Sequence, residues 1–382
     1  MSEIVIIAHR YPTRLDKNGC TFIQQLAWQF ADSGKKCTVI NPINEMETVV
    51  KGERLPKREL EYTENGECIE VLHPRYLNLG QTRRYFGKTL APLTVRLFYR
   101  AVARCYPWAD AAPDAVYAHF IIPAGLAAAR LTREFGVKSY LGHGEALFVA
   151  DEKMGGLERL RNGLNGLTGV IAVSQQNKNY LIDRHLIEPA KIGVFPNGFR
   201  STRFYPVDKA EARKRLGICE DDFIVGYVGR YDYEKGIERL EEAVDQVEGV
   251  KFICAGKGEL KPKSEKCISS KPVPNEELRY FYSSLDAFVL PTLCEGCCNA
   301  IVEAMACGCP IISSDLSFND DLLFPRNSIR INPENVSEIA AAITHLRDDA
   351  EFREALSKGS LEVASGLSLE DRVNNMMDFM AV

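Results

Sequence analysis

Short apolar runs alternate with amphipathic segments along almost the whole chain, and this alternation leaves few folds open to it. The runs of strand length form two series, at residues 4–8, 37–40, 115–119, 139–142 and 170–173, and at 223–228, 251–255, 287–290, 310–313 and 328–331. Between them, apolar side chains recur at helical spacing, as at Ile237, Leu240, Val244 and Val247. Alternating strands and helices predict an α/β fold in which helices cover parallel sheets.

The two series predict two domains, because 382 residues exceed one ordinary hydrophobic core. Turn-forming residues between 195 and 206 mark a linker. We therefore predict Rossmann-like domains at 1–195 and 196–365, and a C-terminal helix at 366–382 that packs back on the N-terminal domain. Open sheets of this kind bind ligands at the carboxyl ends of their strands. Two parallel sheets facing a central cleft would place the active site in that cleft.

The composition is that of a soluble globular protein, with 46% hydrophobic and 26% charged residues. A net charge of −5 gives no overall positive field for nucleic acid. We read no signal peptide at the first residues, and no apolar run approaches the roughly 20 residues of a spanning helix. The 12 cysteines form no disulfide framework, which favours a reducing cytoplasm. No Gly-x-Gly-x-x-Gly follows the first strand, which disfavours a dinucleotide-dependent dehydrogenase.

Metal binding has two weak signals in the sequence. Five cysteines cluster between Cys294 and Cys309, but they lack paired Cys-x-x-Cys spacing and nearby histidines, so small buried residues are the favoured interpretation. Three Asp-Asp pairs, at 221–222, 320–321 and 348–349, are typical of exposed turns or helix ends. We predict no metal site and no cofactor.

The strongest chemical pattern runs from Pro291 to Pro310. A strand end is followed by a loop with Glu295 and Gly296, and then by a helix that we expect to begin near Asn299 as its N-cap, with Glu303 one turn inside. Free amides of residues 297–299 and two carboxylates would then meet at one strand end. Such amides bind phosphate or hydroxyl oxygens, and carboxylates accept hydrogen bonds from sugar hydroxyls. The alternative is one solvated loop acid and one acid that only stabilises the helix N-terminus.

Two further strand ends carry weaker patterns. In the first, Gly229-Arg230 and Lys235-Gly236 flank a short loop before a helix, so two cations would lie over the strand ends and favour the departure of a diphosphate. The alternative is an exposed cation pair. In the second, the loop after the first strand holds Gly19 just before a helix, and a glycine there lets the backbone approach a ligand closely.

Together these segments resemble the retaining glycosyltransferases of family 4, which have the GT-B fold. Glu295 and Glu303 match the family's E-x7-E motif, and Gly229-Arg230 with Lys235-Gly236 match its G-R and K-G segment. Residues 173–174, 194–198 and 255–258 also look like family segments, in the family's order. The resemblance covers nearly the whole chain.

The resemblance implies roles for individual residues. It implies that Glu295 binds the transferred sugar and supports positive charge at its anomeric carbon, that Glu303 binds the ribose, and that Arg230 and Lys235 hold the diphosphate. His119 resembles the family histidine near the transferred sugar. For His143, with Gly144, a sugar-binding role and a structural role both stay open. The remaining donor-binding residues that it implies are Gly19, Gly296, Cys297, Cys298 and Asn299.

The resemblance also implies the reaction. The donor would be a UDP- or GDP-linked sugar, and the leaving phosphate oxygen would itself take the acceptor's proton, without a metal. The segment at 258–274 is shorter than is usual in the family, so the identity of the donor's base, uridine or guanosine, is not determined. Cys297 and Cys298 occupy positions that line the donor sugar, so the identity of the sugar is not determined either. The acceptor would be a glycan or a lipid-linked glycan in cell-surface polysaccharide synthesis. The alternatives are a GT-B phosphorylase or nucleotide-sugar hydrolase, and an inactive GT-B binding protein.

A basic segment suggests a second contact. Residues 82–105 contain six Arg or Lys residues and no acid, interleaved with apolar side chains in which Leu90, Leu93 and Leu97 recur at helical spacing. Such a helix is typical of peripheral binding to an anionic membrane, here on its cytoplasmic face. The alternative is a core-packing helix with a cationic solvent side. The basic residues are Arg83, Arg84, Lys88, Arg96, Arg100 and Arg104.

Overall fold

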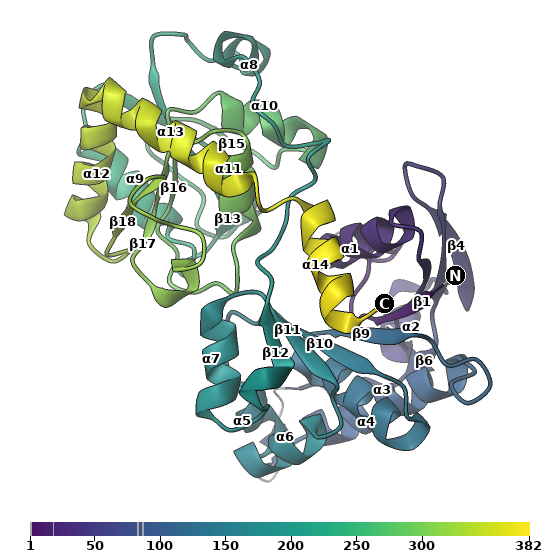
Figure 1. The fold of residues 1–382 in the computed structure, drawn as a ribbon. Coiled ribbons are helices and arrows are strands. Elements are labelled where there is room, and N and C mark those ends of the chain that lie inside the picture. The colour runs from purple at the N-terminus through teal and green to yellow at the C-terminus, as the bar shows by residue number, and fades with distance from the viewer. Residues whose placement is uncertain (1, 18, 82–83, 86–87) are drawn as a thin grey trace. The chain divides into compact units, whose positions relative to one another are not determined.

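The computed structural model describes residues 2–17, 19–81, 84–85 and 88–382 (Figure 1). The chain forms two compact units, one of residues 1–195 with 373–382 and the other of residues 196–372. Each unit is an α/β body with its own sheet. Residues 366–372 of the predicted C-terminal segment thus group with the second unit, and the remaining ten with the first.

The first unit is built on an eight-stranded sheet in the order β12-β11-β10-β9-β1-β2-β5-β4. All neighbours pair parallel, as predicted, except the edge strand β4, which pairs antiparallel with β5. The strands are β1 (Glu3–Ile7), β2 (Lys36–Ile40), β4 (Arg58–Tyr62), β5 (Cys68–Leu72), β9 (Ala115–His119), β10 (Ser139–His143), β11 (Gly169–Ala172) and β12 (Ile192–Val194). Short pairs are β3 (Ile43–Asn44) with β6 (Arg75–Tyr76), and β7 (Arg84–Tyr85) with β8 (Lys88–Thr89).

Helices cover this sheet, and its central strands β9, β10 and β11 are fully buried. Helix α4 packs on both α3 and α6, whereas α1 contacts β2 and β5. The last helix returns to this unit, where the Tyr140 hydroxyl donates to the Met380 carbonyl oxygen at 3.1 Å. The helices are α1 (Thr21–Asp32), α2 (Glu45–Lys51), α3 (Ala91–Cys105), α4 (Leu126–Phe135), α5 (Ala150–Met154), α6 (Leu157–Leu164), α7 (Gln175–Asp183) and α14 (Leu369–Met380).

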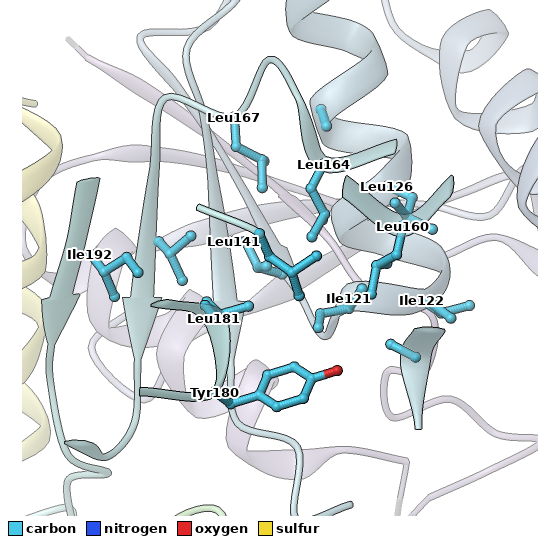
Figure 2. Packing of buried hydrophobic residues seen from close by; sticks show 14 of the residues in the cluster. Ile121, Ile122, Leu126, Leu141, Leu160, Leu164, Leu167, Tyr180, Leu181 and Ile192 are labelled. Carbon is cyan, nitrogen blue, oxygen red and sulfur yellow. The ribbon is translucent and has the colours of Figure 1, made fainter. Parts of the chain in front are cut away.

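One part of the core of this unit lies between α4, α6, α7 and strands β10 to β12 (Figure 2). Leu141, Leu160 and Leu181 are fully buried there. A side chain of this kind contributes about 1.5–3 kcal/mol when it leaves water. This packing fixes the strand ends at which the polar residues of the unit lie.

The second unit carries a six-stranded, wholly parallel sheet in the order β15-β14-β13-β16-β17-β18. From β13 the chain adds β14 and β15 on one side and then β16, β17 and β18 on the other. Ligands of open α/β sheets bind at the point where the strand order reverses in this way. Its strands are β13 (Phe223–Tyr231), β14 (Val250–Gly258), β15 (Cys267–Ser270), β16 (Ala287–Leu290), β17 (Ile311–Ser314) and β18 (Ser328–Ile331). Its helices are α8 (Lys209–Leu216), α9 (Ile237–Asp245), α10 (Leu278–Ser283), α11 (Asn299–Ala306), α12 (Val336–Asp348) and α13 (Ala350–Ala364).

All ten strands predicted from the apolar runs are present, with ends shifted by at most three residues. One of the two largest shifts matters for function. Strand β13 continues to Tyr231 instead of ending at Val228, because it stays paired with β14 as far as Gly258. Arg230 is therefore held on a strand and not in the following loop.

The predicted helix over 82–105 is wrong in its first part. Thr82, Arg83, Phe86 and Gly87 lie outside the described residues, and residues 84–85 and 88–89 form the antiparallel pair β7 and β8. Helix α3 begins only at Ala91, with Pro92 in its first turn, where a proline costs no hydrogen bond. Among the described residues, no helix is both long and apolar enough to cross a bilayer.

The buried side of α3 also differs from the expected leucine stripe. Phe98, Tyr99 and Val102 face the core, whereas Leu93 is 44% exposed. Arg96, Arg100 and Arg104 are exposed as well. The helix therefore packs through its aromatic side and presents a leucine and three arginines on its open side.

Candidate active site

The loops after β13 and β16 hold two charged residues of the predicted motifs in the second unit, Lys235 and Glu295. Gly236 has a left-handed backbone (φ 76°), and a Cβ atom there would lie 2.3 Å from the Pro291 carbonyl oxygen. Only glycine fits a turn that is both left-handed and pressed against the neighbouring loop. The buried Arg239 joins the same two loops, since it donates to the carbonyl oxygens of Tyr233 and Pro291 at 3.0 and 2.9 Å.

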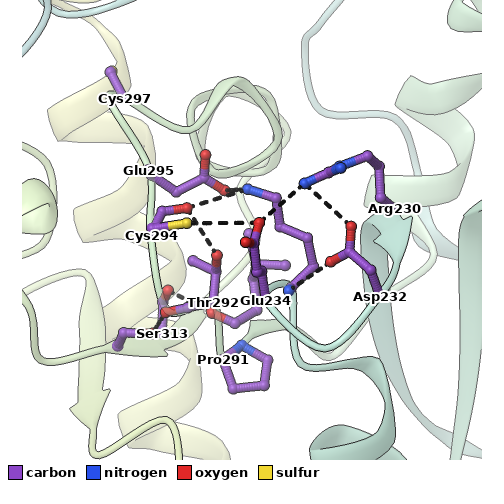
Figure 3. A network of polar contacts seen from close by, with 12 residues as sticks. Arg230, Asp232, Glu234, Pro291, Thr292, Cys294, Glu295, Cys297 and Ser313 are labelled. Atoms are coloured by element: carbon purple, nitrogen blue, oxygen red, sulfur yellow. Dashed lines mark hydrogen bonds and ion pairs between the residues drawn. The ribbon is translucent and has the colours of Figure 1, made fainter. Parts of the chain in front are cut away.

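Two cations and several acids converge at these strand ends (Figure 3). The Lys235 ammonium lies 2.5 Å from the Glu295 carboxylate and donates to the Cys294 carbonyl oxygen at 3.3 Å. Burial by itself lowers the pKa of Lys235, but the Glu295 carboxylate, with smaller effects of Cys298 and Cys294, raises it, and the net shift is upward. Lys235 is thus a fixed positive charge that contacts Glu295, one of the two motif acids.

Arg230 lies at the end of β13 with two acidic neighbours, Asp232 at 3.1 Å and Glu234 at 3.4 Å (Figure 3). Its side chain is 65% exposed, so these ion pairs are weak and an incoming anion can compete for the guanidinium. Asp232 also accepts a hydrogen bond from the Lys235 backbone N–H at 2.9 Å, which shapes the loop. The sequence interpretation missed both acids, although the spacing of Asp232 from Lys235 is typical of a turn cap.

Glu303 lies in α11 and accepts a hydrogen bond from the Tyr282 hydroxyl at 3.0 Å. Burial raises the pKa of Glu303 to about 7, and the Tyr282 hydrogen bond opposes part of that rise. Tyr282 is fully buried in α10 and was not singled out from the sequence. The second motif acid therefore changes its charge near neutral pH.

The start of α11 differs from the expectation in one respect. The residue that precedes the helix is Cys298 and not Asn299, and Asn299 is the first helical residue. The Asn299 side chain instead accepts from the Asn197 amide at 2.8 Å, and the same amide donates to the Cys297 carbonyl oxygen at 3.0 Å. Asn197 therefore ties the linker segment to the loop of the E-x7-E motif, next to the buried Gly296.

In the first unit, His119 ends β9 and is 3% exposed. The Tyr117 hydroxyl lies 2.7 Å from its Nδ1. A phenol that donates to Nδ1 keeps the proton of a neutral imidazole on Nε2. Gly142 makes room for this pair, because a Cβ atom there would lie 2.1 Å from the Tyr117 hydroxyl. Gly144 lies nearby, with a hypothetical Cβ 3.6 Å from Nε2 of His119.

His143 is fully buried, with its Nδ1 2.5 Å from the Glu145 carboxylate. Glu145 also accepts from the Ile121 backbone N–H at 2.5 Å. Burial would raise the pKa of Glu145, but His143 and this amide overcome it, and the net shift is downward. This geometry favours the structural role for His143, which ties the loop after β10 to the loop after β9.

Gly19 directly precedes the residue that begins the turn into α1. A Cβ atom there would lie 2.9 Å from the Asp16 carboxylate and 3.0 Å from the Tyr11 carbonyl oxygen. The loop is thus packed closely around this glycine, and a side chain there would displace the Asp16 carboxylate. Its contact with a donor phosphate stays a prediction.

Next to this loop the first unit has a hollow of about 390 Å³, which we call hollow A. It was not foreseen from the sequence. His9, one of its lining residues, has a buried Nδ1 with no hydrogen-bond partner, and burial followed by the charge of Arg10 lowers its pKa to about 4. The polar lining includes His9, Arg10, Asp16, Asn41, Asn44, Glu47, Asn78 and Gln81.

The cysteine cluster consists of free thiols, and four of its five members, all but Cys294, are buried. Burial raises the pKa of Cys297 to about 12, so this thiol stays protonated. Among the described residues, no three His, Cys, Asp or Glu side chains are grouped so that they could hold a metal ion.

Two family models cover most of the chain. Residues 21–203 match Glycosyltransferase Family 4, and residues 208–362 match Glycosyl transferases group 1. The two matches divide between residues 203 and 208, a short distance after the boundary between the two compact units at residues 195 and 196.

Curated relatives are named as glycosyltransferases. A putative teichuronic acid biosynthesis glycosyltransferase of Bacillus subtilis is 30% identical over 273 residues, which is 65% of this chain and 69% of that protein. The capsular polysaccharide biosynthesis glycosyltransferase CapM of Staphylococcus aureus is 27% identical, over 50% of this chain and 54% of that protein. The UDP-Gal:alpha-D-GlcNAc-diphosphoundecaprenol alpha-1,3-galactosyltransferase of Escherichia coli is 25% identical, over 55% of this chain and 59% of that protein. Among these relatives the alignments span from about half to about two thirds of their length.

Solved structures share the fold over the full length of both chains. Sucrose-phosphate synthase of Thermosynechococcus elongatus superposes with a TM-score of 0.78 at 20% identity, over 100% of this chain and 98% of that one. Anabaena HepE in complex with UDP gives 0.72 at 16% identity, over 100% of both chains. With the two family matches and the Bacillus relative, these likenesses show that the chain belongs to the group 1 glycosyltransferases of family 4 and has the GT-B fold.

Proposed function

We propose that this chain is a retaining glycosyltransferase that moves a sugar from a nucleotide diphosphate donor to a hydroxyl of a saccharide acceptor, in the synthesis of a surface polysaccharide. The observation that carries the proposal is the group of Lys235, Glu295 and Arg230 at the carboxyl ends of β13 and β16. Relatives whose printed names refer to teichuronic acid and capsular polysaccharide support the pathway class.

The donor half of the mechanism follows from the charges. A bound diphosphate would take over the Lys235 ammonium and the exposed Arg230 guanidinium, both of which face carboxylates without it. Glu295, released from Lys235, would then accept from sugar hydroxyls and stabilise positive charge at the anomeric carbon. Two fixed cations favour a leaving diphosphate because they need no reorganisation when its charge develops.

The transfer itself would occur on one face of the sugar. The bond from the anomeric carbon to the phosphate oxygen breaks, the acceptor oxygen bonds to the same face, and the acceptor's proton passes to the departing phosphate oxygen. The chain then supplies position and electrostatics instead of a strong base. His119, kept in one tautomer by Tyr117, would donate from Nε2 to a sugar hydroxyl.

Hollow A is the site that we propose for the acceptor's sugar. Its lining combines neutral amides such as Asn78 and Gln81, the carboxylate of Glu47, and His9, whose pKa of about 4 keeps it neutral at pH 7. Amides, carboxylates and a neutral imidazole all exchange hydrogen bonds with hydroxyls. His9 also stacks edge-on with Phe120 at 5.5 Å, and Phe120 follows His119 directly.

A panel of nucleotide sugars tests the donor assignment. A ligand present at 100 times its dissociation constant stabilises the fold by about 2.7 kcal/mol, which a thermal-shift assay detects. We expect UDP- or GDP-linked sugars to stabilise the wild type and to lose this effect with Lys235→Ala. If no nucleotide sugar stabilises the protein, the inactive binding protein becomes the better account. If turnover proceeds without a saccharide acceptor, the protein is a phosphorylase when phosphate is needed and a hydrolase when water is enough.

We also propose peripheral membrane contact through α3, on the cytoplasmic side. The supporting observation is the open side of this helix, where Leu93 is 44% exposed beside Arg96, Arg100 and Arg104. Sedimentation with anionic liposomes should remove the protein from solution at low salt and should fail at high salt. If the protein stays in the supernatant with anionic vesicles at low salt, this contact is wrong.

A further inference from the structure

A second hollow lies in the first unit, between β6 and α3, and has a volume of about 650 Å³. We call it hollow B. Leu72, Leu77, Leu97 and Ala101 give it an apolar lining, with Leu77 47% exposed. Its size falls in the range of small-molecule sites. An apolar lining that is open to solvent is costly unless something covers it.

Cations surround this apolar lining. They are Lys57, Arg58, Arg75, Arg100 and Arg104, and none of the described lining residues is acidic. Arg58 pairs with Glu70, which lies outside the hollow. The other four have no ion-pair partner among the described residues, although the chain as a whole is acidic. Hollow B is therefore positive in a protein with a net charge of −5.

Arg75 gives a second, independent sign of a ligand. Its Nη2 donates to the Leu55 carbonyl oxygen, but its Nη1 is buried and has no hydrogen-bond partner. A buried guanidinium nitrogen without an acceptor costs on the order of 1–3 kcal/mol. An anion in the hollow would remove that cost.

Hollow B adjoins hollow A, because both are lined by Tyr76 of β6. Strand β6 pairs with β3, where Asn44 lies opposite Tyr76 and lines hollow A. The chemistry changes across this strand. Hollow A is lined by amides, carboxylates, a neutral histidine and one cation, Arg10, which is paired with Asp16 at 2.6 Å. Hollow B has several cations over an apolar lining. One ligand that spans both would have a hydroxyl-rich end and an anionic, apolar end.

We propose that hollow B binds the phosphorylated, hydrocarbon-bearing end of a lipid-linked saccharide, whose sugar occupies hollow A as the acceptor. This inference rests on the proposed transferase function and names the class of its acceptor. A free sugar phosphate needs the cations but not the apolar lining, and a neutral lipid needs the lining but not the cations. A lipid phosphate uses both, and its charge satisfies the unpaired nitrogen of Arg75.

Farnesyl phosphate below its micelle concentration is the probe, with farnesol and inorganic phosphate as its separate halves. Isothermal titration of the full chain should give at least tenfold weaker binding for either half than for farnesyl phosphate. The double variant Arg100→Gln/Arg104→Gln should bind farnesyl phosphate at least tenfold more weakly than the wild type. Arg96→Gln is the matched control, because Arg96 is exposed on the same helix but does not line the hollow. It should stay within twofold of wild type.

Three outcomes would overturn the proposal. The first is equal affinity for farnesol and farnesyl phosphate, and the second is unchanged affinity for farnesyl phosphate in the double variant. The third is a loss of affinity in the Arg96→Gln control as large as in the double variant, which would indicate general attraction to the charged surface instead of a site. Circular dichroism checks that the exposed substitutions leave the fold intact. Nucleotide-sugar binding, measured on the same samples, separates the two claims. If donors bind and farnesyl phosphate does not, the transferase stands and its acceptor is not lipid-linked.

Discussion

The pKa of about 7 at Glu303 predicts that donor binding changes with pH in the neutral range. Ribose hydroxyls donate hydrogen bonds, so they favour the carboxylate over the neutral acid. A group with this pKa is about 10% ionised at pH 6 and about 90% ionised at pH 8. The association constant of an intact nucleotide sugar should therefore rise nearly tenfold from pH 6 to pH 8. Glu303→Gln should bind more weakly and show no such rise.

Titration calorimetry at constant ionic strength measures this directly. An intact nucleotide sugar is the right ligand, because its diphosphate is esterified at both ends and does not titrate between pH 6 and 8. Tyr282→Phe serves as a second variant. It removes the hydrogen bond that lowers the pKa of Glu303, so the midpoint of the pH profile should move upward. A flat profile in the wild type, or the same slope in Glu303→Gln, would refute the ribose role.

Three further predictions concern charge. Lys235→Ala or Arg230→Ala should lower turnover by roughly a hundredfold or more, because each removes a fixed cation from the leaving group; wild-type turnover would contradict the diphosphate assignment. Activity should persist in EDTA, since these two cations take the place of a divalent ion, and complete loss with rescue by Mg²⁺ or Mn²⁺ would show that they do not. Asp286→Asn should lower the free energy of urea unfolding by about 3–5 kcal/mol, because it leaves Arg213, whose side chain is 4% exposed, without its carboxylate at 2.7 Å. Lys209 pairs with the same Asp286 carboxylate, but its side chain is 45% exposed, so Lys209→Gln should lower the free energy of unfolding by less than about 1 kcal/mol. Equal losses in the two variants would contradict the argument from burial.

The strands that the sequence predicted are mostly buried, and each contains a short apolar run. Strand β4 was missed because it lies at the sheet edge and alternates charged and apolar residues, as in Arg58-Glu-Leu-Glu-Tyr62. An alternating exposed strand has no apolar run to detect. The helix predicted for the basic segment before α3 was wrong for a different reason. The apolar residues of this segment fit a helical period, but residues 84–85 pair with residues 88–89 as short strands.

The motif residues could be named from the sequence, but their partners could not. Tyr282 lies 21 positions before Glu303, and the Tyr117 hydroxyl reaches His119 along one face of a strand, as alternate residues do. Nothing in the spacing indicated that Lys235 and Glu295, 60 positions apart, form an ion pair. Nor did the spacing indicate that the two buried histidines, His119 and His143, have different partners. These contacts depend on how loops from different strands meet, which local patterns do not encode.

The stereochemistry of the product tests the central claim most directly. The protein would be incubated with an α-linked nucleotide sugar that stabilises it. Proton NMR would record the anomeric configuration of the first product, formed by transfer to an acceptor or, more slowly, to water. The account predicts an α product that forms before mutarotation and is nearly lost in Lys235→Ala. A β product, or release that does not depend on Lys235, would contradict a retaining transfer at this site.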